Sequence, residues 1–419
     1  LERLGYFKEV SVETVPVPGT DDQIDVLYSV EEETTGSLGG NIGYSDFGLM
    51  LGFNLQEQNF LGSGNTVGIG INKSIYNEVY NISFLDPYAT KDAVSLGYNI
   101  YFRETDYGEF NIANYLTNSA GFGAQFGYPI SDTQRLSFNI TYDKTDIDIG
   151  SLPAREIYDF VATEGSIFET LSAGMSWQTV TLNRGLFPTD GASTALSLST
   201  TVPGSDLSYY RVNLRQRYYQ PLSSDLIFGF QGELGYLSAY GETEETPFFQ
   251  NFYAGGPRSL RGFESNTLGP RSTDAPCYEF NYEEATCPNL IDADGDGELD
   301  SPYYNPYANN TSRYRDPPIG GNIKVEGSLQ LIFRLPFIED QRSMRSAFFF
   351  DFGNVFSDNC KDYQINCYKP SIDDLRYSYG VGITWITGFG PMSFAISKPT
   401  NAGPQERTEE FQFTVGNVF

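Results

Sequence analysis

One feature constrains this chain more than any other: apolar and polar residues alternate one by one over most of its length. Between residues 94 and 103, and again between 136 and 143, apolar side chains occupy every second position. This period of two is typical of β-strands that have one apolar and one polar face. No run of about 18 apolar residues is present, which excludes a transmembrane helix. A closed barrel also hydrogen-bonds every backbone group in lipid, so we expect a transmembrane β-barrel rather than a soluble sandwich with shorter strands.

Sixteen candidate strands can be counted, and the connections between them are alternately short and long. Short turns contain Pro and Asp, as at 188–191 and 221–225, whereas the polar segments 145–168 and 255–320 are long. This pattern is typical of outer-membrane barrels, and an even strand number places both barrel ends in the periplasm. We therefore expect an all-β fold, with residues 34–419 forming a 16-stranded antiparallel barrel in the outer membrane of a Gram-negative bacterium. The candidate strands are 36–44, 47–56, 65–74, 77–85, 92–104, 116–128, 134–147, 168–183, 192–202, 206–219, 225–240, 322–335, 344–356, 375–387, 392–399 and 409–419.

Residues 1–33 follow a different pattern from the rest of the chain. A short helix end, a strand, a turn at 18–22 and a second strand follow one another. This unit is too small to enclose a hydrophobic core by itself. We expect it to be the tail of an α+β module that begins before Leu1, in a processed or shortened chain, and to lie in the periplasm.

Charge and histidine content disfavour several classes of function. The chain carries 26 Lys and Arg against 54 Asp and Glu, a net charge of −28. Such a surface repels nucleic acid, so no nucleic-acid partner is expected. Histidine is absent, which removes Ser-His-Asp and Cys-His catalysis and His-ligated zinc. We therefore expect a protein that is not an enzyme and requires no cofactor.

The four cysteines form two close pairs in polar segments, Cys277 with Cys287 and Cys360 with Cys367. Pairs of this kind favour disulfides and an oxidising compartment. Four free thiols are the alternative.

The long polar segment contains a run of acidic residues between 292 and 300 that is similar to the first nine positions of a calcium-binding loop. Oxygen ligands at positions 1, 3, 5 and 9, with glycine at position 6, suit a hard cation. Tyr303 stands where such loops place a bidentate glutamate. Bound Ca²⁺ and an acidic, solvated loop tip therefore remain alternatives. The candidate ligands are Asp292, Asp294, Asp296 and Asp300.

The most specific motif lies where a strand enters the long segment 255–320. Here the sequence Leu260-Arg261-Gly262-Phe263 resembles the VRGF/Y motif of the BamA superfamily, with Leu in the first place. Flanking residues and turns are also similar, and the resemblance covers essentially the whole chain.

The resemblance implies a specific arrangement inside the barrel. In this family the long loop folds into the lumen, where its motif arginine meets an acid on the inner wall. The matching wall residue is Asp351, the expected partner of Arg261. A second wall acid of the family corresponds to Gln330, so Asp351 is expected to carry more of the interaction. An arginine fork suits planar, bidentate contact with a carboxylate.

The chain ends also resemble parts of this family. Residues 1–33 are similar to the C-terminal part of the last POTRA domain, cut short. The last strand ends on Phe419, like the C-terminal recognition signal of outer-membrane barrels. Gly36, Gly39 and Gly40 in the first strand, and Gly416 in the last, lower strand stability. The resemblance then implies a weak lateral seam through which client barrels are folded and inserted.

The same resemblance implies partners, and other functions remain open. The implied partners are outer-membrane lipids and lipopolysaccharide, accessory assembly lipoproteins and unfolded client β-barrel proteins. The alternatives are a TamA-like or two-partner secretion translocator, which shares the Arg-Gly-Phe motif, and a passive porin. An outer-membrane hydrolase is disfavoured by the absence of histidine.

Overall fold

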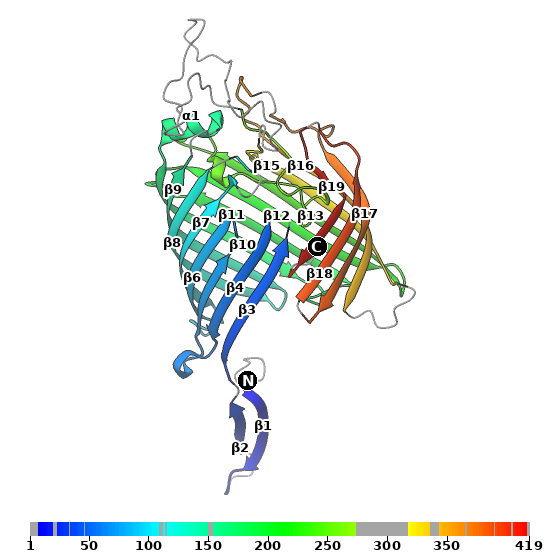
Figure 1. The fold of residues 1–419 in the computed structure, drawn as a ribbon. Helices are drawn as coiled ribbons and strands as arrows, with labels where there is room; N and C mark the ends of the chain where they lie inside the picture. The colour runs from blue at the N-terminus through cyan, green and yellow to red at the C-terminus, as the bar shows by residue number, and fades with distance from the viewer. Residues whose placement is uncertain are drawn as a thin grey trace, which may run out of the picture.

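A computed structural model describes residues 7–416 except 20–22, 33, 46, 109–111, 114, 150–153, 274–316, 336–342, 365–366, 389 and 404. The main body is a closed barrel of sixteen antiparallel strands, as predicted (Figure 1). Neighbours in the chain are neighbours in the barrel, and the last strand returns to the first. The barrel strands are β3 (Gly36–Ser45), β4 (Gly48–Glu57), β5 (Thr66–Lys73), β6 (Asn77–Asp86), β7 (Ser95–Asp106), β8 (Leu116–Ser131), β9 (Gln134–Asp148), β10 (Ile167–Val180), β11 (Gly191–Thr201), β12 (Tyr209–Pro221), β13 (Leu226–Ala239), β15 (Ile323–Phe333), β16 (Met344–Phe356), β17 (Arg376–Thr387), β18 (Gly390–Pro399) and β20 (Phe411–Val415).

The alternation seen in the sequence separates the two faces of the wall. On β7 the outward side chains Tyr98, Ile100 and Phe102 are 41%, 57% and 44% exposed. Such a band of exposed apolar side chains suits contact with lipid. The intervening residues face the lumen, where Tyr101 donates a hydrogen bond to Asp143 on β9. Among the described residues no helix is long and apolar enough to cross a membrane.

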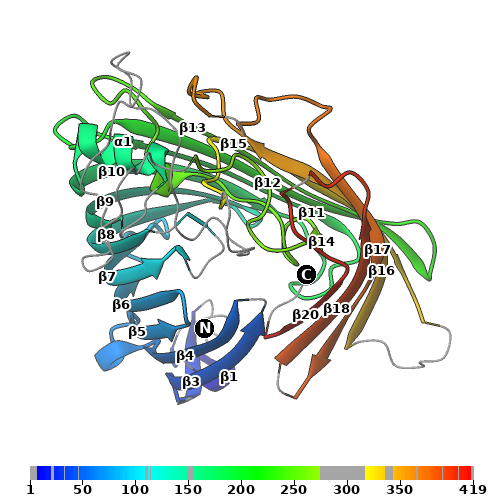
Figure 2. The ribbon, with the colours of Figure 1, turned by 45° about the horizontal axis from the view of Figure 1, so that its top comes forward.

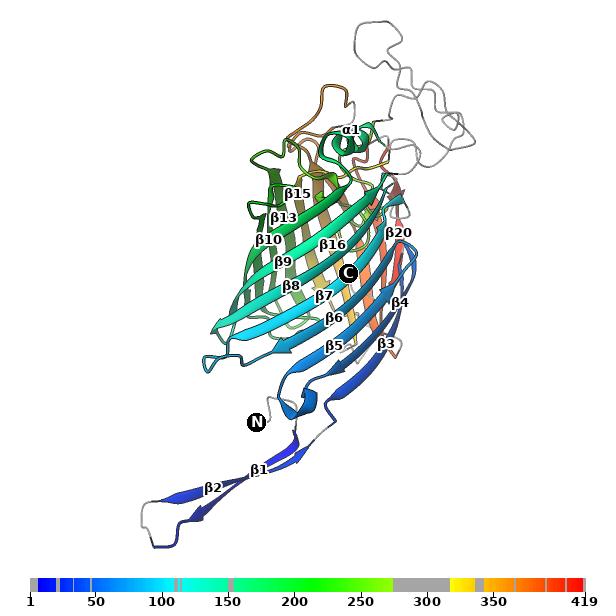
Figure 3. The same ribbon diagram turned by 90° about the vertical axis from the view of Figure 1, so that its left-hand side faces the viewer.

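A hairpin stands off the periplasmic end of the barrel (Figure 3). It consists of β1 (Phe7–Pro16) and β2 (Ile24–Glu32), which pair antiparallel. Several of its apolar side chains are exposed, including Val12 at 56% and Ile24 at 60%. The predicted helix end lies mostly outside the described residues, and assignment of 1–33 to a POTRA domain stays a prediction.

The loop between β9 and β10 contains a helix that the sequence analysis missed. Helix α1 (Arg155–Glu164) places Ile157 and Phe160 on one buried face. They pack with Phe168 and Phe248 in a core at the extracellular end, next to the short helix η4 (Phe248–Gln250). The prediction of a loop over 145–168 was therefore incomplete, because the apolar spacing of three that marks this helix occupies only ten residues. A second short helix, η2 (Phe60–Gly62), lies in the turn between β4 and β5.

A buried segment that we call the plug, residues 252–272, fills part of the lumen (Figure 2). It contains the two-residue strand β14 (Gly262–Phe263), which pairs with β19 (Thr408–Glu409). The apolar side chains of Leu260, Phe263 and Leu268 pack against the wall residue Val355. The plug is the described part of the long segment that was expected to fold inward.

Candidate functional site

The plug presents Arg261 to the inner wall at a turn that needs glycine. Gly262 follows with φ +90°, a left-handed conformation that L side chains rarely adopt. A Cβ atom at Gly262 would also lie 3.1 Å from Ser397 Oγ and 3.3 Å from Pro399 Cδ. Glycine therefore lets the backbone turn close to the wall directly after Arg261.

Arg261 and Asp351, on β16, form a bidentate ion pair, the contact that the family resemblance implied. Arg261 Nε lies 2.7 Å from Asp351 Oδ2, and Arg261 Nη2 lies 2.7 Å from Oδ1. The backbone N–H of Arg261 also donates to Oδ2, at 3.2 Å. The Asp351 side chain is fully buried and that of Arg261 is 6% exposed. Removal of either partner would leave the other as a buried, unpaired charge.

Two further wall residues contact Arg261, and the sequence analysis gave neither a role. The guanidinium carbon lies 3.5 Å from the ring centroid of Phe349. Arg261 Nη2 donates to Ser328 Oγ at 2.9 Å. Phe349 could have been found, because it precedes Asp351 by two residues on the same strand and so shares its face. Gln330 is buried and donates to Ser328, not to Arg261.

The plug is also tied to the last strand of the barrel. Gln412, on β20, is 1% exposed. Its amide nitrogen donates to the carbonyl of Phe263 at 2.8 Å, and its amide oxygen accepts from the N–H of Gly262 at 3.3 Å. One side chain thus satisfies two buried backbone groups of β14.

The preceding residues strengthen this attachment. Arg407 pairs with Glu264 of the plug at 3.1 Å, and Arg271 Nη2 donates to the Gln405 carbonyl at 2.7 Å. The segment that leads into β20 is therefore held from inside the barrel.

The junction between β20 and β3, which we call the seam, has a short ladder within the described residues. Only Val415 and Tyr44 are in register across it among the described residues, whereas β20 has five register pairs with β18. Gly36, Gly39 and Gly40 pair with β4 and have no ladder partner on β20. Figure 2 shows the two strands meeting at this position.

Of the two residues predicted for the seam in the last strand, the structure describes Gly416 but not Phe419. Gly416 has φ +81°, and a Cβ atom there would lie 3.2 Å from Gly43 Cα. Two glycine backbones thus approach each other directly after the register pair of Tyr44 with Val415. The described part of β20 ends at Val415, and residues 417–419 of the predicted strand, including Phe419, lie outside the described residues. Tyr44 and Val415 could not be identified from the sequence, because the register of a short strand cannot be read from its alternation.

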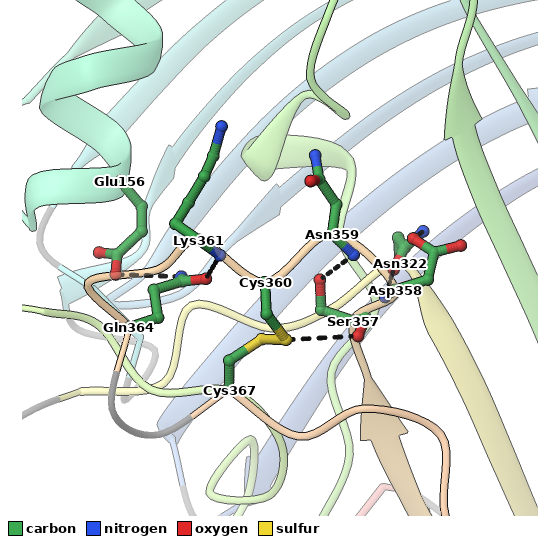
Figure 4. Close-up of a disulfide and its surroundings, with 9 residues drawn as sticks. All are labelled: Glu156, Asn322, Ser357, Asp358, Asn359, Cys360, Lys361, Gln364 and Cys367. Carbon is green, nitrogen blue, oxygen red and sulfur yellow. Dashed lines mark hydrogen bonds between the residues drawn. A yellow bond between two sulfur atoms is a disulfide. The ribbon is translucent and has the colours of Figure 1, made fainter.

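The predicted disulfide Cys360–Cys367 is present, with its Cα atoms 5.8 Å apart, in the loop after β16 (Figure 4). Within this small ring, Gln364 donates to Glu156 of α1 at 3.0 Å. The backbone N–H of Thr273, at the end of the plug, also donates to Glu156, at 3.0 Å to Oε2. Burial raises the pKa of Glu156 above its ordinary value. Three extracellular segments thus meet at one buried carboxylate.

Two predicted sites lie outside the described residues. These are the Cys277–Cys287 pair and the acidic run with Asp292, Asp294, Asp296 and Asp300. In the part of the chain that the structure describes, no cluster of His, Cys, Asp and Glu could hold a metal ion.

Sequence comparison relates this architecture to known proteins. Residues 59–419 match the Omp85 superfamily domain. The outer membrane protein assembly factor BamA of Neisseria meningitidis serogroup B is 30% identical over the whole chain, which covers 51% of that protein. The human sorting and assembly machinery component 50 homolog is 24% identical over 93% of the chain and 74% of its own length. The chain spans about half the length or less of the first BamA relatives.

Solved structures agree with this relationship. BamA from Haemophilus ducreyi lacking POTRA domains 1–3 superposes with a TM-score of 0.80 at 28% identity, covering 99% of this chain and 76% of that one. CdiB from Acinetobacter baumannii gives a TM-score of 0.54 at 11% identity, over 99% of this chain and 66% of that one. The second likeness concerns the fold alone.

Proposed function

The chain belongs to the Omp85 superfamily, and from this premise we propose that it is an outer-membrane assembly factor that folds and inserts client β-barrel proteins. Its relatives with 30% and 22% identity over the whole chain carry the name outer membrane protein assembly factor. One observation carries the proposal: within the described residues, the barrel closes through a single register pair at the seam.

The weak seam supplies a physical mechanism. A backbone hydrogen bond contributes about 0.5–1.5 kcal/mol net, so a junction with one register pair opens at small cost. An open seam exposes the free N–H and C=O groups of β3, whose residues Gly36 to Asn41 are exposed along their length. A free edge of this kind templates an added strand by β-augmentation. Client strands would pair here before they leave into the membrane.

The plug has a supporting role in this mechanism. Because Gln412 and Arg407 hold the segment around β20 to the plug, that side of the seam stays fixed. The Arg261–Asp351 pair fixes the plug in turn. Opening would then move β3, which lacks comparable attachment to the plug among the interactions of the described residues.

The location and the partners follow from the same proposal. The barrel lies in the outer membrane of a Gram-negative bacterium, with hairpin β1–β2 on the periplasmic side. Its partners are unfolded client barrels, outer-membrane lipids including lipopolysaccharide, and accessory assembly lipoproteins. The role needs no catalytic group and no cofactor.

A cross-link across the seam tests the proposal. Tyr44 and Val415 are directly opposite each other, so the variant Tyr44→Cys/Val415→Cys can form a disulfide. Oxidation should abolish insertion of a client barrel into proteoliposomes. The matched control is Ile82→Cys/Ile100→Cys, a register pair within the wall between β6 and β7. The proposal is wrong if the seam cross-link leaves insertion at the level of this oxidised control.

A further inference from the structure

A hollow in the luminal wall has a charge opposite to that of the chain as a whole. Its cavity of about 380 Å³ is lined by residues of β10 to β13, β15 and the plug. Three arginines line it, Arg215 and Arg217 of β12 and Arg258 of the plug, against two carboxylates, Glu233 and Glu326. The lining therefore has a formal charge of 3 − 2 = +1 in a chain whose net charge is −28.

The two carboxylates are already engaged with groups of the protein. Lys324 Nζ lies 3.4 Å from Glu233 and 3.0 Å from Glu326. Glu233 also accepts from Asn213 at 2.6 Å, and Glu326 accepts from Ser259. Glu233 also pairs with Arg215, whose Nε lies 3.2 Å from it. The charge available to a ligand is therefore that of the other two arginines of the lining.

Two of the arginines have no carboxylate partner among the residues that the structure describes, namely Arg217 and Arg258. Arg258 is the single exposed residue between 251 and 273, a segment that is otherwise buried or half-buried. A long cationic side chain thus extends from a buried plug into a cavity that holds a second unpaired arginine. This convergence provides fork-shaped donors for an anion.

The space beside these arginines is elongated along the strands. Inward-facing residues of β11 are small, with Ser193 and Ala195 lining the first cavity. A second cavity of about 270 Å³ shares Ala195 and Arg215 with it and extends to Arg211. The two cavities together follow β12 along an arginine ladder at positions 211, 215 and 217.

The spacing of this ladder indicates the shape of the ligand. Side chains two residues apart on a strand are separated by roughly 7 Å, and those four apart by roughly 13 Å. An extended peptide with acidic residues at alternate positions has the same repeat. The hollow also lies in the periplasmic half of the wall, because Ser193 and Arg217 are close to the strand ends that the periplasmic connections 181–190 and 222–225 join.

From these observations we propose that the hollow is a binding site for an acidic, extended polypeptide segment that enters the lumen from the periplasm. Arg217 and Arg258 bind its carboxylates, and the small side chains of β11 leave room for its backbone. The site does not depend on opening of the seam, so its test is separate from that of the proposed function.

Binding can be measured directly on the full chain in detergent micelles. The probe is a fluorescent peptide of about eight residues in which Glu and Thr alternate, long enough to span the ladder. A peptide of the same composition with its Glu residues in one block tests whether the spacing of the carboxylates matters. Inorganic phosphate as a competitor tests whether the site binds any small anion. We expect fluorescence anisotropy to show the alternating peptide binding about tenfold tighter than the block peptide, with affinity falling as salt rises.

Two variants and a control identify the site. Arg217→Gln/Arg258→Gln should weaken binding of the alternating peptide about a hundredfold, since each arginine supplies a charge-assisted contact. Ala195→Trp fills the hollow without removing charge and should also prevent binding. The control Lys91→Gln/Arg184→Gln removes two cations from periplasmic turns, outside both cavities, and should bind as the parent does. Heat-modifiable gel mobility verifies that each variant is folded.

Several outcomes would overturn the proposal. Equal affinity for both peptides, or full competition by phosphate at the peptide's own concentration, would indicate a site for small anions or lipid phosphate. An equal loss in the control would indicate attraction by net charge alone. If the folded parent does not bind the alternating peptide, the arginines of the hollow contact only water and the proposed site does not exist.

Discussion

The junctions on the two sides of the barrel differ in how they are held together. Strands β8 and β9 are in register from Leu116 opposite Asp148 to Ser131 opposite Gln134. In the part of the chain that the structure describes, strands β20 and β3 share one register pair. The last strand is held by five register pairs with β18 on its other side, and Gln412 also binds it to the plug from inside. The junction of β8 with β9 is thus stabilised by a long backbone ladder, whereas β20 is additionally held by side-chain contacts in the lumen.

The largest expected effect comes from the ion pair that anchors the plug. Asp351→Asn leaves Arg261 buried without a counter-charge and should destabilise the barrel by about 3–5 kcal/mol. The urea midpoint, followed by gel mobility, measures the change. Arg261→Gln/Asp351→Asn removes both charges and should recover part of the loss. A single variant as stable as the parent would show that the plug is held by other contacts.

A smaller effect is expected from the side chain that holds the last strand. Gln412→Leu leaves the Gly262 N–H and the Phe263 carbonyl buried without partners, which costs about 1–3 kcal/mol. Hydrogen exchange in β20 should rise, while exchange in β8 and β9 stays as in the parent. Equal changes in both places would contradict the difference between the two junctions.

Gly416→Ala should weaken the pairing of β20 with β3 at the seam without changing other contacts of the barrel. The left-handed backbone at this position disfavours alanine by roughly 1 kcal/mol, and the new Cβ approaches Gly43. We expect the cross-linking yield of Tyr44→Cys/Val415→Cys to fall about fivefold. As a control, Gly185→Ala adds a Cβ where no atom lies within 4 Å and should leave the yield unchanged. An unchanged yield in Gly416→Ala would show that the end of the ladder is not strained.

The smallest expected effect is a pH dependence of the extracellular contacts. Burial raises the pKa of Glu156 above its ordinary value of about 4.5, so the folded state favours the protonated carboxyl. The contribution of this group to stability is therefore fully present below pH 4.5. That contribution is lost as pH rises through the higher folded-state pKa. Hydrogen exchange of α1, corrected for the intrinsic pH effect, should therefore be slower at pH 4 than at pH 7. Glu156→Gln should remove this difference, and an unaltered difference would assign it to another group.

Sequence alone accounted for most of the fold and part of the site. Alternation gave all sixteen barrel strands within a few residues, because a strand between lipid and a wet lumen shows its two faces in its residues. The contact between Arg261 and Asp351 came from a motif resemblance rather than from any pattern of spacing.

Other features could not be read from the chain. Gln412 looks like any polar residue of an alternating strand, and its two bonds to the plug depend on long-range packing. The register of the seam depends on a strand of five residues, too short for alternation to define it. The arginines of the hollow are distant in sequence, and only the fold brings Arg258 to β12.

The pairing of β14 with β19 constrains how this protein must itself mature. The plug is made between β13 and β15, but its partner strand is synthesised after β18, almost at the end of the chain. Its contacts with Gln412 form only when the plug and the last strand are both in place. The attachment of the plug to the wall beside the seam therefore cannot be completed until almost the whole of this sequence has been made.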